Sequence, residues 1–181
     1  LKIDPDHYQS AYHLASVLLI QKNPDQALKY FRLAARDKTL EADSLAGQGH
    51  CFRLLGNVKK AREILNKIQQ RYPDNTTAKF ELARLDIDDG NYQEAFKRLE
   101  PIVTADPQHS DARYQYAIVL REIGRTEEAR DHFLAVKEIG KQLANANDLA
   151  EQITTDASSA DTRLEIAKIH LQHGSRREGL M

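Results

Sequence analysis

The pair Leu82-Ala83, followed by Gly90-Asn91-Tyr92-Gln93-Glu94-Ala95, decides the fold. A helical segment with a small residue, a tight glycine turn and a second helical segment recur along almost the whole chain. Four positional series share a period of 34 residues. They are Ala27, Ala61, Ala95 and Ala129; Ala15, Gly49, Ala83 and Ala117; Gly56, Gly90 and Gly124; and Phe31, Leu65, Leu99 and Phe133. A fixed period in this range indicates an array of stacked helical hairpins.

The residue types fit their places in this period. Small residues let paired helices approach closely, and the bulky residues fill the space beside them. Each turn glycine can adopt a left-handed conformation that ends the first helix. Asn57 and Asn91 follow two of these glycines and are expected to cap the next helix, as Asn23-Pro24 does in the first hairpin. Prolines at 73 and 107 are expected to stop the second helices.

This pattern resembles the tetratricopeptide repeat (TPR) family. The resemblance implies an all-α fold, a right-handed solenoid of helix-turn-helix hairpins forming one array over residues 1–181. Four complete repeats cover Tyr8–Glu41, Ala42–Asn75, Thr76–His109 and Ser110–Leu143, and a truncated repeat covers 160–181 with Ala167 and Gly174 in its small and turn positions. Three residues depart from the pattern: Lys22 in a turn-glycine position, Asp86 in an apolar position and Gly179 in an alanine position.

The expected helices follow from these boundaries. They span Tyr8–Gln21, Pro24–Asp37, Glu41–Leu55, Val58–Tyr72, Thr76–Asp89, Tyr92–Ala105, Ser110–Ile123 and Ala160–His173. Between the last two, the spacing predicts one long helix from Thr126 to about Ile153, because apolar residues continue at steps of three and four. These are Val136, Ile139, Leu143, Ala146, Ala150 and Ile153. Packing inside the array and docking of another chain both explain this seam.

Composition excludes several classes of protein. The net charge of −1 and the pI near 6.7 argue against binding to nucleic acid or to a membrane surface. No apolar run approaches the roughly 18 residues of a transmembrane helix, so we expect no direct membrane insertion. A single cysteine, Cys51, rules out an internal disulfide. Both ends resemble cuts within repeats, so we expect a longer protein whose targeting sequence lies elsewhere; cytoplasm and periplasm both remain open.

The first helices carry the predicted binding residues. In TPR proteins these helices line a concave groove that holds an extended peptide or a partner helix, and the resemblance implies the same here. Aromatic residues on such a surface supply apolar area, and arginines pair with carboxylates. The predicted peptide-binding residues are Tyr12, Ser16, His50, Arg53, Phe80, Arg84, Tyr114, Ile118 and Arg121. The alternative for each aromatic ring is packing between neighbouring helices.

Candidate chemistry is weak throughout the chain. His170 and His173 share a helix face without an evident third metal ligand. The stretch from Asp86 to Gly90 departs from a calcium loop, because its glycine comes one residue early, and Asp86 is expected to pair with an arginine or a tyrosine instead. The lysine and asparagines of the TPR carboxylate clamp are also missing, since Tyr12, Ser16 and Gly47 occupy their positions. We expect no catalytic residue, metal or other cofactor.

The sequence therefore favours a non-catalytic scaffold that binds a protein or peptide in its groove. Two alternatives remain: a regulatory or substrate-presenting module of a larger enzyme or membrane-associated assembly, and a self-assembly module. The second alternative follows from helix faces left exposed at the ends of an array, which would form homo-oligomers.

Overall fold

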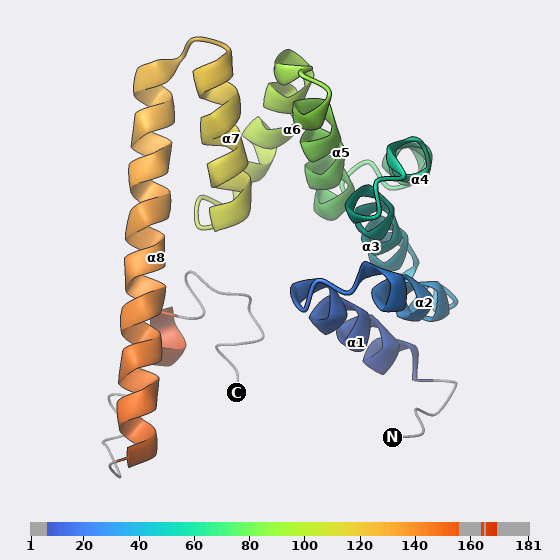
Figure 1. Ribbon diagram of the computed structural model, residues 1–181, viewed down its shortest axis with the longest axis horizontal. Coiled ribbons are helices and arrows are strands. Elements are labelled where there is room, and N and C mark those ends of the chain that lie inside the picture. The colour runs from blue at the N-terminus through green and yellow to red at the C-terminus, as the bar shows by residue number, and fades with distance from the viewer. Residues whose placement is uncertain (1–6, 156–163, 165, 170–181) are drawn as a thin grey trace. The chain divides into compact units, whose positions relative to one another are not determined.

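The computed structural model describes residues 7–155, 164 and 166–169. Helices and their connecting turns make up this part of the chain, as the repeat predicts (Figure 1). The chain divides into two compact units, residues 1–98 and 99–181, with the boundary inside one helix. The single array over the whole chain stays a prediction.

The helices form successive hairpins that begin at the predicted residues, and most of them end within about one residue of the prediction. They are α1 (Tyr8–Ile20), α2 (Pro24–Ala34), α3 (Glu41–Leu54), α4 (Val58–Arg71), α5 (Thr76–Asp88), α6 (Tyr92–Ala105), α7 (Ser110–Glu122) and α8 (Thr126–Thr155). The unit boundary lies within α6, between Arg98 and Leu99. In the first unit, α1 contacts α2 and α3, and α3 contacts α2, α4 and α5. His170, His173 and Gly174 lie outside the described residues.

The turns confirm the roles given to the periodic glycines. Gly56, Gly90 and Gly124 have φ angles of 75°, 74° and 86°. Lys22 occupies the same place in the first hairpin and has a φ of 57° although it is not glycine. The left-handed conformation is therefore a requirement of the hairpin, and Lys22 meets it at an energetic cost that glycine avoids.

Side-chain caps start several helices. The side chains of Asn23 and Asn57 accept hydrogen bonds from the backbone N–H groups three residues later, at 3.4 and 3.3 Å, as predicted. Asn75 caps α5 in the same way at 2.8 Å, and the His109 Nδ1 accepts from the backbone N–H of Ala112 at 3.3 Å. These bonds satisfy N–H groups that a helix start leaves without an intrahelical partner.

The second helix of the first hairpin is shorter than predicted, because α2 ends at Ala34 rather than Asp37. The backbone tightens there: the N–H of Asp37 donates to the carbonyl of Ala34, three residues back. The Asp37 carboxylate then accepts from the backbone N–H and the hydroxyl of Thr39, at 2.8 and 2.7 Å. An aspartate that bonds locally in this way favours a turn over continued helix.

Two glycines in α3 mark close approaches to neighbouring helices in the first unit. A methyl group placed on Gly49 would lie 2.6 Å from the Cγ of Leu65 in α4. One placed on Gly47 would lie 2.6 Å from the ring of Phe31 in α2. Leu65 and Phe31 are both buried in the core of this unit. Gly47 and Gly49, of which the second belongs to the periodic small-residue series, therefore set how closely α2 and α4 can pack against α3.

Asp86 pairs with arginines, as expected from its position near the core. Its side chain is 5% exposed and accepts from the Arg62 Nη1 in α4 at 2.7 Å and from the Arg98 Nε in α6 at 2.8 Å. Arg62 also contacts Asp89 at 2.7 Å, which closes the network at the helix end. One buried carboxylate thus joins α5 to a helix on each side of it in sequence.

The second unit includes the antiparallel pair α7 and α8, and α8 continues well past the end of α7 (Figure 1). The long helix is confirmed, and two residues of its apolar seam, Ile139 and Ala146, are buried. Between the pair, the rings of Tyr116 and His132 meet edge to face at 5.0 Å. Burial, with the nearby Arg113 cation, lowers the pKa of His132 below its ordinary value.

The turn conformation yields a paired prediction. Replacing Lys22 by glycine should raise the free energy of unfolding by roughly 0.5–1 kcal/mol, because it removes left-handed strain. Gly56→Ala should lower it by about 1 kcal/mol, because alanine must adopt that same conformation. Urea denaturation followed by circular dichroism measures both. A destabilised Lys22→Gly protein would contradict the shared turn geometry.

The half-buried His132 predicts a loss of stability in acid. The unfolded chain binds a proton on His132 at its ordinary pKa of about 6.5, whereas the folded chain resists protonation. The free energy of unfolding should therefore fall as pH drops below about 6.5. His132→Gln should reduce this loss, whereas replacement of the exposed His7 by glutamine should not. Urea midpoints between pH 7.5 and 5 test this, and an equal acid loss in the His132→Gln protein would contradict it.

Candidate functional site

The first helices of the first unit, α1, α3 and α5, carry six of the predicted binding residues. Consecutive members of this set contact one another, α1 with α3 and α3 with α5. We call the surface defined by these residues the first-helix face. Its residues are Tyr12, Ser16, His50, Arg53, Phe80 and Arg84.

A buried carboxylate organises the central part of this face. The side chain of Glu81 in α5 is 2% exposed and lies among three side chains that can carry positive charge. Its Oε2 accepts from the Arg53 Nε at 3.0 Å, and its Oε1 lies 3.2 Å from the His50 Nδ1. The same Oε1 lies 3.4 Å from the Arg84 Nη1. Glu81 therefore ties α3 to α5 and fixes where these side chains lie.

The two arginines play different parts in this cluster. Arg53 is only 11% exposed and spans from Glu81 towards Asp88, whose carboxylate lies 3.8 Å from its Nη1. Arg84 is 27% exposed, and its guanidinium carbon lies 5.6 Å from the centre of the Phe80 ring. A guanidinium at this distance from an aromatic ring gains cation–π stabilisation. Arg53 thus joins helices, and Arg84 is the arginine that meets solvent.

The aromatic residue of α1 packs against the core. Tyr12 is half-buried, and its ring meets Phe31 edge to face at 5.7 Å and His13 at 5.9 Å. The hydroxyl of Ser16 donates to the backbone carbonyl of Tyr12 at 3.0 Å, within the same helix. Much of the Tyr12 ring therefore packs between helices, which was the alternative to peptide binding. The rest of the side chain belongs to the first-helix face.

The other three predicted residues lie on α7 in the second unit. Tyr114 is 46% exposed, and its ring meets Phe133 of α8 edge to face at 5.7 Å. Ile118 is half-buried, and Arg121 is exposed and donates to Glu122 at 2.9 Å. A continuous groove that includes these residues and the first-helix face stays a prediction.

Glu81 is not among the binding residues predicted from the sequence. Its contact with Arg84 is an i, i+3 pair that the sequence shows. Its contacts with His50 and Arg53 join residues 31 and 28 positions apart. The 34-residue period places the helices of His50 and Glu81 side by side. This period, combined with the length of the side chains, is the signal from which the contacts of Glu81 could have been predicted.

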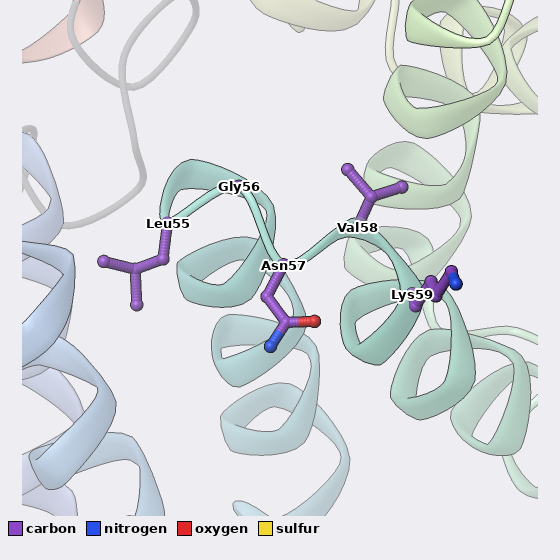
Figure 2. Close-up of a pocket in the computed structure, with 5 residues that line it drawn as sticks. All are labelled: Leu55, Gly56, Asn57, Val58 and Lys59. Carbon is purple, nitrogen blue, oxygen red and sulfur yellow. The ribbon is translucent and has the colours of Figure 1, made fainter.

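One hollow in the described part of the chain is lined by none of the residues of the first-helix face. This hollow lies at the turn between α3 and α4 and is lined by Leu55, Gly56, Asn57, Val58 and Lys59 (Figure 2). Figure 2 shows the side chains of Leu55 and Val58 pointing away from each other, and all five residues are exposed. Such an open turn does not bring reactive groups together.

The remaining candidate chemistry gives the same result. Cys51 is fully buried, and burial raises the pKa of its thiol to about 12, so it stays protonated and unreactive at neutral pH. Among the described residues, no cluster of three or more histidine, cysteine, aspartate or glutamate side chains is arranged to hold a metal ion. The described helices also include none with the length and apolar character needed to span a membrane.

Family models identify the repeat along most of the chain. Three models, each described as tetratricopeptide repeat, match residues 1–40, 43–75 and 86–142. Together they cover well over half of the sequence. A comparison with curated proteins gave no match.

Solved structures with a similar fold include several of MamA. The structure titled "MamA AMB-1 C2221" has a TM-score of 0.57 and 18% identity, and the alignment covers 96% of this chain and 92% of that one. "MamA 41-end from Desulfovibrio magneticus RS-1" has a TM-score of 0.55 and 16% identity, with 97% and 92% covered. At this identity the likeness shows a shared fold.

Proposed function

The chain belongs to the tetratricopeptide repeat family, and we propose that its first-helix face binds an extended peptide with an acidic residue beside an apolar or aromatic one. Repeats of this family are generally non-catalytic modules for protein–protein interaction. The chain is accordingly a scaffold for protein partners. The proposal adds where the partner binds and which chemistry it offers.

The buried Glu81 is the observation that carries this proposal. Its carboxylate neutralises one positive charge, while Arg53 and Arg84 supply two. The carboxylate of Asp88, which is 54% exposed, lies 3.8 Å from the Arg53 Nη1. Arg84 is more exposed than Arg53, at 27% against 11%, and is therefore the cation that an incoming carboxylate can reach. An arginine can hold a carboxylate through two parallel hydrogen bonds.

The surroundings of Arg84 favour binding over a solvated surface role. Its guanidinium is held by Glu81 at 3.4 Å and by the Phe80 ring, so less side-chain entropy is lost when a ligand binds. Phe80 is half-buried and offers part of its ring to an apolar side chain of the same peptide. A charged residue next to an apolar one in the ligand matches this arrangement.

The test selects ligands without assuming their identity. A phage library of random 12-residue peptides is panned against the protein, and selected peptides are labelled with fluorescein for anisotropy titrations. We expect enrichment of aspartate or glutamate adjacent to an apolar or aromatic residue. Arg84→Glu should weaken binding of these peptides by about tenfold or more, because it replaces attraction by like-charge repulsion.

Two further variants separate binding from folding. Arg84→Gln removes the charge without placing a second carboxylate beside Glu81, and it should also weaken binding while helix content by circular dichroism stays unchanged. Lys29→Glu changes the same charge at an exposed site on α2 and should leave affinity within about twofold. Two results would show that the first-helix face does not bind a carboxylate. One is the selection of peptides without acidic residues, and the other is equal peptide affinity of the Arg84→Gln protein and the unaltered protein.

A further inference from the structure

His50 and Arg84 occupy the same position in successive repeats. They lie 34 residues apart, on the first helices α3 and α5, which contact each other. Both side chains also reach the same oxygen. The Oε1 of Glu81 lies 3.2 Å from the His50 Nδ1 and 3.4 Å from the Arg84 Nη1. The repeat and the contacts therefore both place the imidazole beside the guanidinium on the first-helix face.

The imidazole is about as open to solvent as the guanidinium. The His50 side chain is 25% exposed and that of Arg84 is 27% exposed, whereas the Glu81 side chain that they share is 2% exposed. A peptide that approaches Arg84 from solvent can therefore also come close to His50.

The charge of this cluster depends on the protonation of His50. The ionised side chains joined by these contacts are Arg53 and Arg84, which are positive, and Glu81 and Asp88, which are negative. Their charges sum to zero. A neutral imidazole leaves this sum unchanged, whereas a protonated one adds a positive charge. An ordinary histidine side chain titrates near about pH 6.5, so a small change around neutral pH can make the cluster cationic.

The other helices that contact α3 bring their own charged and titratable groups. These include Tyr12 and His13 from α1, Asp25 from α2 and Lys60 from α4. The Asp25 carboxylate acts on the Cys51 thiol, and the Lys60 Nζ lies 4.6 Å from the centre of the Phe52 ring. Residues one and two positions apart do not share a helix face, so these two charges act on other sides of α3 than that of the imidazole. The histidine of α1 is accordingly the one to compare with His50.

We propose that His50 is a second, proton-dependent cation of the peptide-binding site, and that its imidazole takes up a proton when an acidic peptide binds Arg84. This inference rests on the proposed function. The peptide carboxylate and the imidazolium attract each other, so the complex holds the proton more firmly than the free protein does. Binding and proton uptake are linked, and the affinity for an acidic peptide should therefore rise as the pH falls.

Calorimetric titrations with one selected peptide, between about pH 8 and pH 5.5, test this coupling. The peptide is synthesised without histidine and with blocked ends, so that its aspartate or glutamate, which titrates near about pH 4, stays ionised throughout. We expect the dissociation constant to fall about threefold or more towards the acidic end, as one added charge near the ligand predicts. Near neutral pH, titrations in buffers of different ionisation enthalpy should show net proton uptake on binding.

Three variants assign the proton to a residue. His50→Gln keeps a polar side chain beside Glu81 but cannot take up the proton, so its affinity should not change with pH and its proton uptake should disappear. His50→Arg carries a permanent charge, and should bind at the alkaline end about as tightly as the unaltered protein binds at the acidic end. His13→Gln is the matched control from α1 and should keep the full pH dependence. Circular dichroism at each pH confirms that every protein is folded.

The outcomes distinguish this inference from the proposed function. Selected peptides that bind the Arg84→Gln protein as tightly as the unaltered protein would overturn both. If Arg84→Gln weakens binding but the affinity does not change with pH, the proposed function stands and the role of His50 is overturned. The same holds if the His50→Gln protein keeps its pH dependence. Loss of the pH dependence in the His13→Gln protein would also overturn this role, because the proton would then belong to α1.

Discussion

The close approach of helices at small residues is the constraint on which the rest of the first unit depends. At Gly47 and Gly49 there is no room for even a methyl group, because Phe31 and Leu65 occupy that space from either side. This contact brings α2, α3 and α4 together tightly enough to bury the core. It also determines where the next first helix, α5, meets α3, and hence where a side chain can reach from one to the other.

Two buried carboxylates of α5 build on that spacing. Glu81 binds side chains of α3, and Asp86 binds arginines of α4 and α6. A buried carboxylate is stable only when cations and hydrogen bonds compensate for its lost hydration. Each therefore fixes the arginines around it. In our account the Asp86 network holds helices together, while the Glu81 cluster also leaves one ordered guanidinium, that of Arg84, at the surface for a partner.

The sequence predicted the helical hairpins well because local and periodic signals agree in them. The left-handed turn at Lys22 shows that the period was informative even where the residue type was not. The end of α2 was missed, since a bond between Asp37 and Thr39 competes with the helix there. The binding face was predicted only in part. Spacing placed Arg53 and Arg84 among the predicted binding residues. Their different roles follow from how deeply each guanidinium is buried beside Glu81, and this depends on contacts between helices.

A double-mutant cycle on the contact between Gly49 and Leu65 tests this account most directly. Gly49→Ala introduces a clash, Leu65→Ala removes the atoms it clashes with, and the free energies of unfolding come from urea denaturation of all four proteins. Close packing predicts that the doubly substituted protein is less destabilised than the sum of the single changes, by about 1 kcal/mol or more. Strictly additive effects would mean that the two helices do not meet at these residues, and the account of the fold would be wrong.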